Sequence, residues 1–340
     1  MAAHFLLTAK ARTLSQASIF RMSDDEAHET FTAIRFADNG GAAFCPRCQC
    51  TAVYTYAARR IWKCKACNHQ FSVTSGTIFA SRKLAIRDYL AATAIFVNAV
   101  KGISALQLGR DLDVQYKTAF VLAHKLREAI GKEQSEAQLS GVIEIDGAYF
   151  GGHVKQENQK ADRKDRRLAS EQTGKRQSVV VARERNGKTL PFVVAKEADA
   201  VVLIRERVAM GSIVHADEAG GWDRLHAYYD VMRINHSVAF SLGGACTNQA
   251  ESYFSRLRRA ELGQHHHISG KYLAAYAVEM AWREDTRRKP NGALHQAATA
   301  AALAHPVSRQ WRGYWQRSHK FILTRESGHH NSSEDADVYI

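Results

Sequence analysis

The sequence predicts an α/β protein in which a mixed sheet, with the element order βββαβαβα, follows two smaller N-terminal modules. Short apolar runs typical of strands alternate with helical segments from about residue 140 onward. Residues 83–131 have helical periodicity instead, and a cysteine-rich stretch precedes them. We therefore divide the chain into an N-terminal helix with a flexible start, a cysteine-rich module, a helical module, an α/β domain and a disordered polar tail, at 1–40, 41–80, 81–135, 140–317 and 318–340.

The composition is that of a globular protein with a polyanionic partner. The 340 residues are 45% hydrophobic, and 47 Lys and Arg against 34 Asp and Glu give a net charge of +13. This surplus favours nucleic acid, because each neutralised phosphate releases condensed counterions, although many soluble proteins are basic without such a role. Apolar runs are too short for a membrane span or a secretory signal. We expect a cytoplasmic protein with reduced cysteines.

The first helix has a clear start. Ser23 precedes "DDEAHETFTAI", and Glu26 follows three residues later, which is the pattern of a capping box. The glycines of "DNGG" end the helix.

Two Cys-x-x-Cys pairs form the strongest local signal. They are separated by 15 residues rich in strand formers, and such pairs on facing turns can hold Zn²⁺ tetrahedrally. A redox pair or chance is the alternative. Four protein ligands leave no open position, so this zinc would stabilise a small module and would not be catalytic. The four ligands are Cys45, Cys48, Cys64 and Cys67, which leaves Cys50 and Cys246 as free thiols.

The helical module has the pattern of a helix-turn-helix. The run "GISALQLGRDLDVQYKTAFVLAHKLREAIG" divides at Asp113 into two helices joined by a tight turn. The start of the second helix, including Lys117, would face a major groove. Two packed helices of any all-α module would give the same pattern. The expected inner face of the first helix is Ile103, Leu106, Leu108 and Leu112.

The α/β domain begins with three strands, at "GVIEIDGAYFGG", "QSVVVARER" and "KTLPFVVAK", the last two joined through "NG". Helix "DAVVLIRERVA", strand "SIVHAD", helix "WDRLHAYY" and strand "MRINHSVAF" follow, and a last helix contains "CTNQAESYFSRLRR". Between the first two strands, residues 153–176 hold eight Lys or Arg against four acids. We interpret this stretch as a mobile loop that holds phosphates, although charged runs are usually only solvated.

Three acids fall on these elements. Asp146 lies within the first strand, Asp217 ends the fourth, and Glu251 lies near the start of the last helix. Phosphoryl transfer with two divalent ions needs such a set of carboxylates. Each acid also has a simpler explanation, since Asp146 could belong to a hairpin turn, Asp217 could be an N-cap, and Glu251 could form a capping box with Asn248.

Helix geometry assigns a role to the arginines beside Glu251. At about 100° per residue, Ala250, Tyr253, Phe254 and Leu257 form an apolar stripe. Arg258 lies almost two turns after Glu251 and over the same edge, where it can bind a phosphate while the carboxylate holds a metal ion.

The motifs of the chain resemble those of the ISXO-like insertion-sequence DDE transposases of bacteria. The similar runs are "EIDGAYFGG", "VHADEAGGWDRL", "RINHSVAFS", "TNQAESYFSRLRRAELGQHHHIS" and "YAVEMAWRED", preceded by "CPRC", "CKAC" and "FSVTSGTIF". The resemblance covers roughly residues 24–317. It implies a zinc ribbon, an RNase H-like fold, end cleavage and strand transfer with two Mg²⁺ (or Mn²⁺) ions, and recognition of terminal inverted repeats.

Within this resemblance the catalytic, Mg²⁺-binding acids are Asp146, Asp217 and Glu251, the last two 34 positions apart. Asn248 matches a motif position that is the third ligand in some members, but a carboxylate is the better Mg²⁺ ligand. Gly147 stands where many relatives have Glu, which leaves Glu144 as the neighbouring acid.

The resemblance and the charge pattern together predict the DNA contacts. Arg258 replaces a Lys of many relatives and can bind phosphate bidentately. His236 and His267 match motif positions without a physical role that we can assign. Two element ends acting together imply a homo-oligomer on DNA, associated with the nucleoid. The expected DNA-binding residues are Lys117, Lys164, Arg166, Arg167, Asn248, Arg258 and Arg259.

Two other functions remain open at this point. The chain could be a zinc-ribbon and helix-turn-helix transcription regulator with an inactive RNase H-like scaffold. It could also be a nuclease of related fold that hydrolyses DNA without strand transfer.

Overall fold

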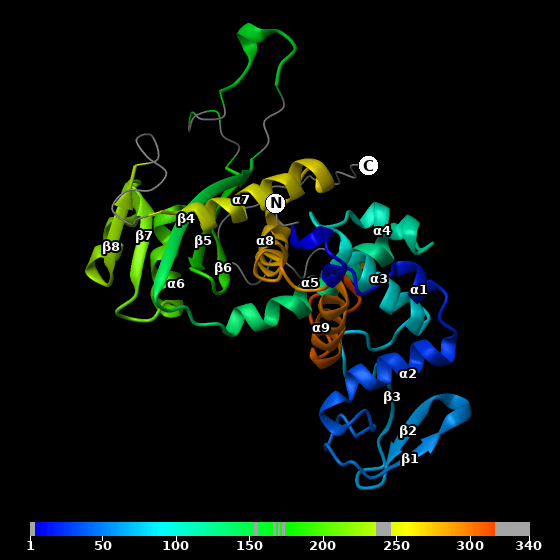
Figure 1. Ribbon diagram of the computed structural model, residues 1–340. Coiled ribbons are helices and arrows are strands. Elements are labelled where there is room, and N and C mark those ends of the chain that lie inside the picture. The colour runs from blue at the N-terminus through cyan, green and yellow to red at the C-terminus, as the bar shows by residue number, and fades with distance from the viewer. Residues whose placement is uncertain are drawn as a thin grey trace.

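The computed structural model describes residues 4–152, 156–165, 168, 171, 174–235 and 246–316. Figure 1 shows a twisted sheet with its helices beside a mainly helical part, which carries a second, small sheet at its far end. The helices are α1 Gln16–Phe20, α2 Asp24–Arg35, α3 Ile86–Asn98, α4 Ala105–Asp111, α5 Tyr116–Glu136, α6 Ala200–Arg207, α7 Asn248–Ala260, α8 Gly270–Asp285 and α9 Asn291–Ala304. Within the described residues, no helix has the length and apolarity needed to cross a membrane.

The larger sheet has five strands in the order β6-β5-β4-β7-β8. β4, β5 and β6 are antiparallel neighbours, whereas β7 pairs parallel with β4 and β8 parallel with β7. The expected mixed sheet is therefore confirmed, although residues 236–240 of its last predicted strand lie outside the described ranges. The bounds are β4 Val142–Gly151, β5 Arg176–Glu184, β6 Thr189–Val194, β7 Ile213–Asp217 and β8 Asp230–Ile234.

The sheet separates two cores. Alternation along β4 sends Ile145 to one face, where it is buried among residues of α6. Ala148 and Phe150 point to the other face and are buried against α7 and α8. Asp146 and Glu144 alternate in phase with Ala148, so both belong to the face that α7 covers.

The prediction of one helix in the α/β domain is wrong. "WDRLHAYY" is not an α-helix, because residues Gly220–Ala227 form 3₁₀ turns. Two glycines at the start disfavour an α-helix, and the buried ring of Trp222 donates from Nε1 to Asp217 at 2.7 Å. The turns therefore stay close to the end of β7.

The helical part and the small sheet share one continuous core. The small sheet is antiparallel, with strands β1 Val53–Tyr56, β2 Ile61–Cys64 and β3 Gln70–Ser72. Its Trp62 and Phe71 are buried in the same cluster as Phe31 of α2 and Leu90 of α3. The capping box of α2 is confirmed, since Ser23 N donates to Glu26 at 2.7 Å and Glu26 N donates to Ser23 at 3.2 Å.

Helix α9 and the N-terminal segment complete this helical part. Ala298 and Leu303 of α9 are buried in the cluster that holds α3 and α5. The Asn291 side chain, at the start of α9, accepts from Thr13 N at 2.8 Å and Leu14 N at 2.9 Å, and it donates to Leu14 O at 2.8 Å. The chain near residue 13 is thereby held against a helix that begins 278 residues later in the sequence.

Helices α4 and α5 meet at the predicted turn, where Asp113 has a φ of 52°. Of the expected inner face, Ile103 and Leu108 are buried and Leu112 packs against the same core, but Leu106 is exposed, so its place on that face is wrong. The first turn of α5 contacts Trp315, close to the end of the described residues. There Trp315 Nε1 donates to Lys117 O at 3.2 Å, and the Lys117 ammonium lies 5.3 Å from the Trp315 ring.

Candidate functional site

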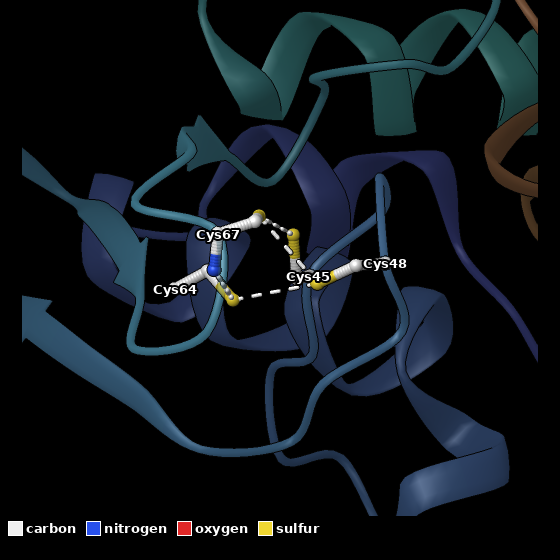
Figure 2. A group of neighbouring side chains, drawn as sticks. All are labelled: Cys45, Cys48, Cys64 and Cys67. Atoms are coloured by element: carbon white, nitrogen blue, oxygen red, sulfur yellow. Dashed lines mark hydrogen bonds between the residues drawn. The ribbon is translucent and has the colours of Figure 1, made fainter.

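Four cysteines converge from two turns, one before β1 and one between β2 and β3 (Figure 2). Cys45 and Cys67 are 3.7 Å apart at sulfur, and Cys48 lies 3.5 Å from both Cys64 and Cys67. A tetrahedron with Zn–S bonds of about 2.3 Å has edges of about 3.8 Å. The sulfur positions therefore fit one zinc ion, as the sequence predicts.

The two halves of this cluster repeat one backbone geometry. Gln49 N donates to Cys45 O and Asn68 N donates to Cys64 O, and both donors have positive φ, at 61° and 57°. A hydrogen bond from the Cys67 backbone N–H lowers the pKa of Cys64 to about 6. A thiolate is the form that binds a metal ion, so at Cys64 the local backbone favours ligation.

The two aspartates lie side by side where β7 ends next to the middle of β4. Ile145 pairs with Ala216 across β4 and β7, so the next residues, Asp146 and Asp217, continue that register. Asp146 pairs with Val181 inside the ladder to β5. The hairpin-turn explanation of Asp146 is therefore wrong. Its Oδ1 accepts the N–H of Gly147 at 2.8 Å.

The loop that follows Asp217 donates hydrogen bonds to its carboxylate. Its Oδ1 accepts from Ala219 N at 3.2 Å and from Trp222 Nε1 at 2.7 Å. The N-cap of the 3₁₀ segment is Ala219, without a side-chain hydrogen bond, so Asp217 is not that cap. Its contacts instead fix the carboxylate at the end of β7.

Glu251 lies on helix α7, which packs against the same face of the sheet. The helix begins at Asn248 with Thr247 as N-cap, and that cap position makes no side-chain capping bond. A capping box of Asn248 with Glu251 would need Asn248 as the N-cap. Because Thr247 is the N-cap, Glu251 lies one position too far into the helix. The predicted apolar stripe of α7 is confirmed, because Ala250, Tyr253, Phe254 and Leu257 are all buried.

The three acids share a face without forming a closed cage. In the described part of the chain, the four cysteines are the one group of metal-binding side chains whose ligand atoms all lie within 4.8 Å of one another. The acids nevertheless fit Mg²⁺ by their chemistry, since hard carboxylate oxygens are its preferred ligands. Asp146, Asp217 and Glu251 are each half-buried, which leaves the face accessible to a substrate.

Two further acids lie near the aspartates, Glu144 on the face of the sheet that α7 covers and Glu197 on the opposite face, and sequence reasoning assigned a role to neither. Glu144 is fully buried, and its Oε2 accepts the N–H of Gln249 at 2.7 Å. Glu197 lies over Gly147, where an added Cβ would come within 2.7 Å of its Oε1. Burial, and then the nearby Asp217, raise the pKa of Glu197. Only the glycine at 147, which leaves room for this carboxylate, could have pointed to it.

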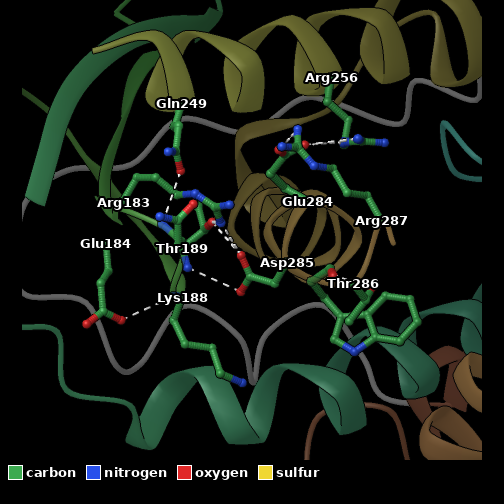
Figure 3. Close-up of polar contacts among 12 residues, drawn as sticks. Arg183, Glu184, Lys188, Thr189, Gln249, Arg256, Glu284, Asp285, Thr286 and Arg287 are labelled. Atoms are coloured by element: carbon green, nitrogen blue, oxygen red, sulfur yellow. Dashed lines mark hydrogen bonds and ion pairs between the residues drawn. The ribbon is translucent and has the colours of Figure 1, made fainter. Parts of the chain in front are cut away.

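Helix α7 is also attached along its length (Figure 3). Arg256 donates to Glu284 of α8 at 2.9 and 3.0 Å. The neighbouring Asp285 accepts from Thr189 of β6 at 2.6 Å and is paired with Arg183 of β5. The end of α8 thereby connects α7 to the sheet and limits how far the helix can move from the aspartates.

The expected DNA contacts lie on different parts of the surface. Arg258 and Arg259 are exposed on α7, and Asn248 is exposed at its start. Lys164 is exposed within residues 156–165, a part of the β4–β5 connection that stands away from the sheet (Figure 1). His267 is exposed beyond α7. Arg166, Arg167 and His236 lie outside the described residues.

Two known domain families match the chain. The transposase zinc-ribbon domain matches residues 22–70, which hold α2 and the four cysteines. The ISXO2-like transposase domain matches residues 138–285, which hold the five-stranded sheet, the three acids and α8. Together the two ranges cover more than half of the chain.

A relative from Halobacterium salinarum, described as an uncharacterized protein in transposable element ISH50, is 25% identical over 282 residues. That alignment covers 79% of this chain and 93% of the relative. Two solved structures, the Mos1 strand transfer complex and a pre-cleavage Mos1 transpososome, match with 10% and 11% identity and TM-scores of 0.24 and 0.21. Each covers 63% of this chain and 78% of its own, and scores this low establish no shared fold.

Proposed function

Because this chain belongs to the ISXO2-like transposase family, we propose that it is the DNA transposase of an insertion sequence. It binds the terminal inverted repeats of its element, cleaves the DNA ends with Mg²⁺ and joins them to target DNA. The observation that carries this proposal is the shared face of Asp146, Asp217 and Glu251, which come from two parallel strands and the helix that covers them.

The three carboxylates would hold the divalent ions. When bound, two Mg²⁺ (or Mn²⁺) ions would activate the attacking oxygen and stabilise the leaving oxygen. Asp146 keeps its orientation through Gly147, and Asp217 through Trp222, so neither side chain has to be ordered at the moment of reaction.

The reaction has two phosphoryl transfers. In the first, a water oxygen bonds to phosphorus at the element end and the P–O3′ bond breaks, which leaves a free 3′-OH. In the second, that 3′ oxygen bonds to a target phosphorus and the target's own 3′ oxygen leaves. The protein contributes positioning and charge, with Arg258 and Arg259 holding phosphates beside Glu251.

The remaining modules serve recognition in this proposal. The four cysteines hold one structural zinc, and α4 with α5 form a helix-turn-helix that reads the inverted repeats. The order β6-β5-β4-β7-β8, with the first three strands antiparallel, supports an RNase H-like assignment of the catalytic domain. Two element ends acting together require at least a dimer on DNA, within the nucleoid of the cytoplasm.

The test uses DNA that carries the sequences flanking the gene of this chain. Purified protein and Mg²⁺ are incubated with these ends and a target plasmid, and nicked and joined products are separated. Asp146→Asn is the matched control, because the amide can still accept the Gly147 N–H but is a poor Mg²⁺ ligand. We expect joined products from wild type alone. End binding without cleavage in both proteins would contradict the proposal.

A further inference from the structure

Glu144 caps helix α7 from another element. Its Oε2 accepts the N–H groups of Gln249 at 2.7 Å and Ala250 at 3.2 Å. These are the second and third residues of α7, whose N–H groups have no partner inside the helix. Glu144 is fully buried at the positive end of the helix dipole, a position where a carboxyl oxygen is a favourable acceptor for both N–H groups.

The other oxygen of Glu144 is held in turn. Arg185, the residue after β5, donates to Oε1 at 3.1 and 3.3 Å, and the same guanidinium lies 2.9 Å from the sulfur of Cys246, just before α7. Both carboxylate oxygens are therefore used, one for the helix and one for the arginine that follows β5.

His215 makes a matching contact from the neighbouring strand. It is the register partner of Glu144 across β4 and β7. Its Nδ1 accepts from Cys246 N at 3.1 Å, and it lies 3.3 Å from both the Arg185 guanidinium and Cys246 O. One pair of strand residues thus holds the start of α7 at two consecutive points.

The position of this pair carries the inference. Two residues after Glu144 comes Asp146, and two residues after His215 comes Asp217, on the same face of the sheet. We propose that Glu144 and His215 are positioning residues: they fix α7, which carries Glu251, against the strands that carry the aspartates. The expected effect on metal binding and cleavage rests on the proposed function, whereas the contacts that hold α7 do not depend on it.

Glu144→Gln tests this with little change of shape. A glutamine offers one acceptor oxygen where Glu144 uses two, so either the helix N–H groups or Arg185 must lose a partner. Glu184→Gln is the matched control, because that carboxylate lies in the same sheet and bonds to Ser140 and Lys188 instead of α7. His215→Leu removes the second contact, and His215→Asn, whose oxygen can replace Nδ1, should restore it.

Three properties of the full chain are measured: amide hydrogen exchange of residues 247–252, Mn²⁺ affinity by electron paramagnetic resonance, and cleavage of element ends. For Glu144→Gln we expect faster exchange at the start of α7, with Mn²⁺ affinity and cleavage reduced about 10- to 100-fold and DNA binding unchanged. Glu184→Gln should match wild type. If Glu144→Gln does not fold, the pair His215→Leu and His215→Asn decides.

Wild-type exchange and Mn²⁺ affinity in Glu144→Gln would overturn the inference. So would a loss of DNA binding as large as the loss of cleavage, since that indicates general disruption. If wild type itself neither binds Mn²⁺ nor cleaves, the proposed function fails, while the exchange measurement still tests whether Glu144 holds α7.

Discussion

Glu279 lies on α8 between two arginines that are as buried as it is. Arg127 of α5 donates to it at 2.6 Å, and Arg283 donates at 2.9 Å from one turn later. Burial alone would raise the pKa of Glu279, but the two guanidinium groups lower it overall, so the carboxylate is charged. Arg283 also donates to Phe96 O of α3 at 2.6 Å. One carboxylate thus joins α5 and α8 and, through Arg283, α3.

We expect Glu279→Ala to destabilise the protein by about 3–5 kcal/mol, because it leaves two buried cations without their anion. Asp25→Ala removes the partner of Arg60 in an exposed ion pair, and such pairs contribute only about 0–1 kcal/mol. Urea unfolding of both variants measures the difference. A loss below about 1 kcal/mol for Glu279→Ala would mean that the surrounding helices do not depend on this network.

Elements were predictable where the deciding signal is local. The capping box at Ser23, the two cysteine turns and the "NG" connection between β5 and β6 each depend on residues a few positions apart, and Asn186 indeed has a φ of 63°. The segment after Asp217 was not predictable in this way. Its 3₁₀ form depends on the buried contact of Trp222 with Asp217.

Removal of zinc should affect more than the small sheet. Cys45 and Cys64 are buried in the same core as Trp62, Phe71 and helix α2. Without a metal ion the clustered thiolates would repel one another or take up protons, and the turns that hold them would separate. We expect chelation, or Cys64→Ser, to lower the melting temperature of the helical part and to make the region before residue 80 sensitive to protease.

Cys50→Ser is the control for this prediction, because its sulfur lies near Ala52 O and outside the four-cysteine cluster. It should melt and resist protease like wild type. Metal-free protein, verified by elemental analysis, that melts at the wild-type temperature would disprove the zinc assignment.

For the whole molecule, contacts between distant parts of the sequence were beyond prediction. Glu144 meets Gln249, and Asn291 meets Thr13, across long stretches of chain that carry no signal of either contact. The face that α7 presents to the sheet was predictable, because its apolar stripe is local. The sequence therefore indicated three candidate acids for the site, but not the residues that hold the start of α7 against the strands.

The net charge of +13 is a property of the whole molecule, and it leads to a prediction about how DNA affinity depends on salt. DNA affinity should fall steeply with salt, with a slope of about −0.9 for each phosphate that a cation neutralises. Arg258 and Arg259 are exposed in the last turn of α7, so their joint replacement by Ala should reduce the slope by about 2. Lys188→Ala also removes a cation, but one paired with Glu133, and it should leave the slope unchanged. An equal slope in the double variant and wild type, by fluorescence anisotropy across a salt series, would place the DNA backbone away from α7.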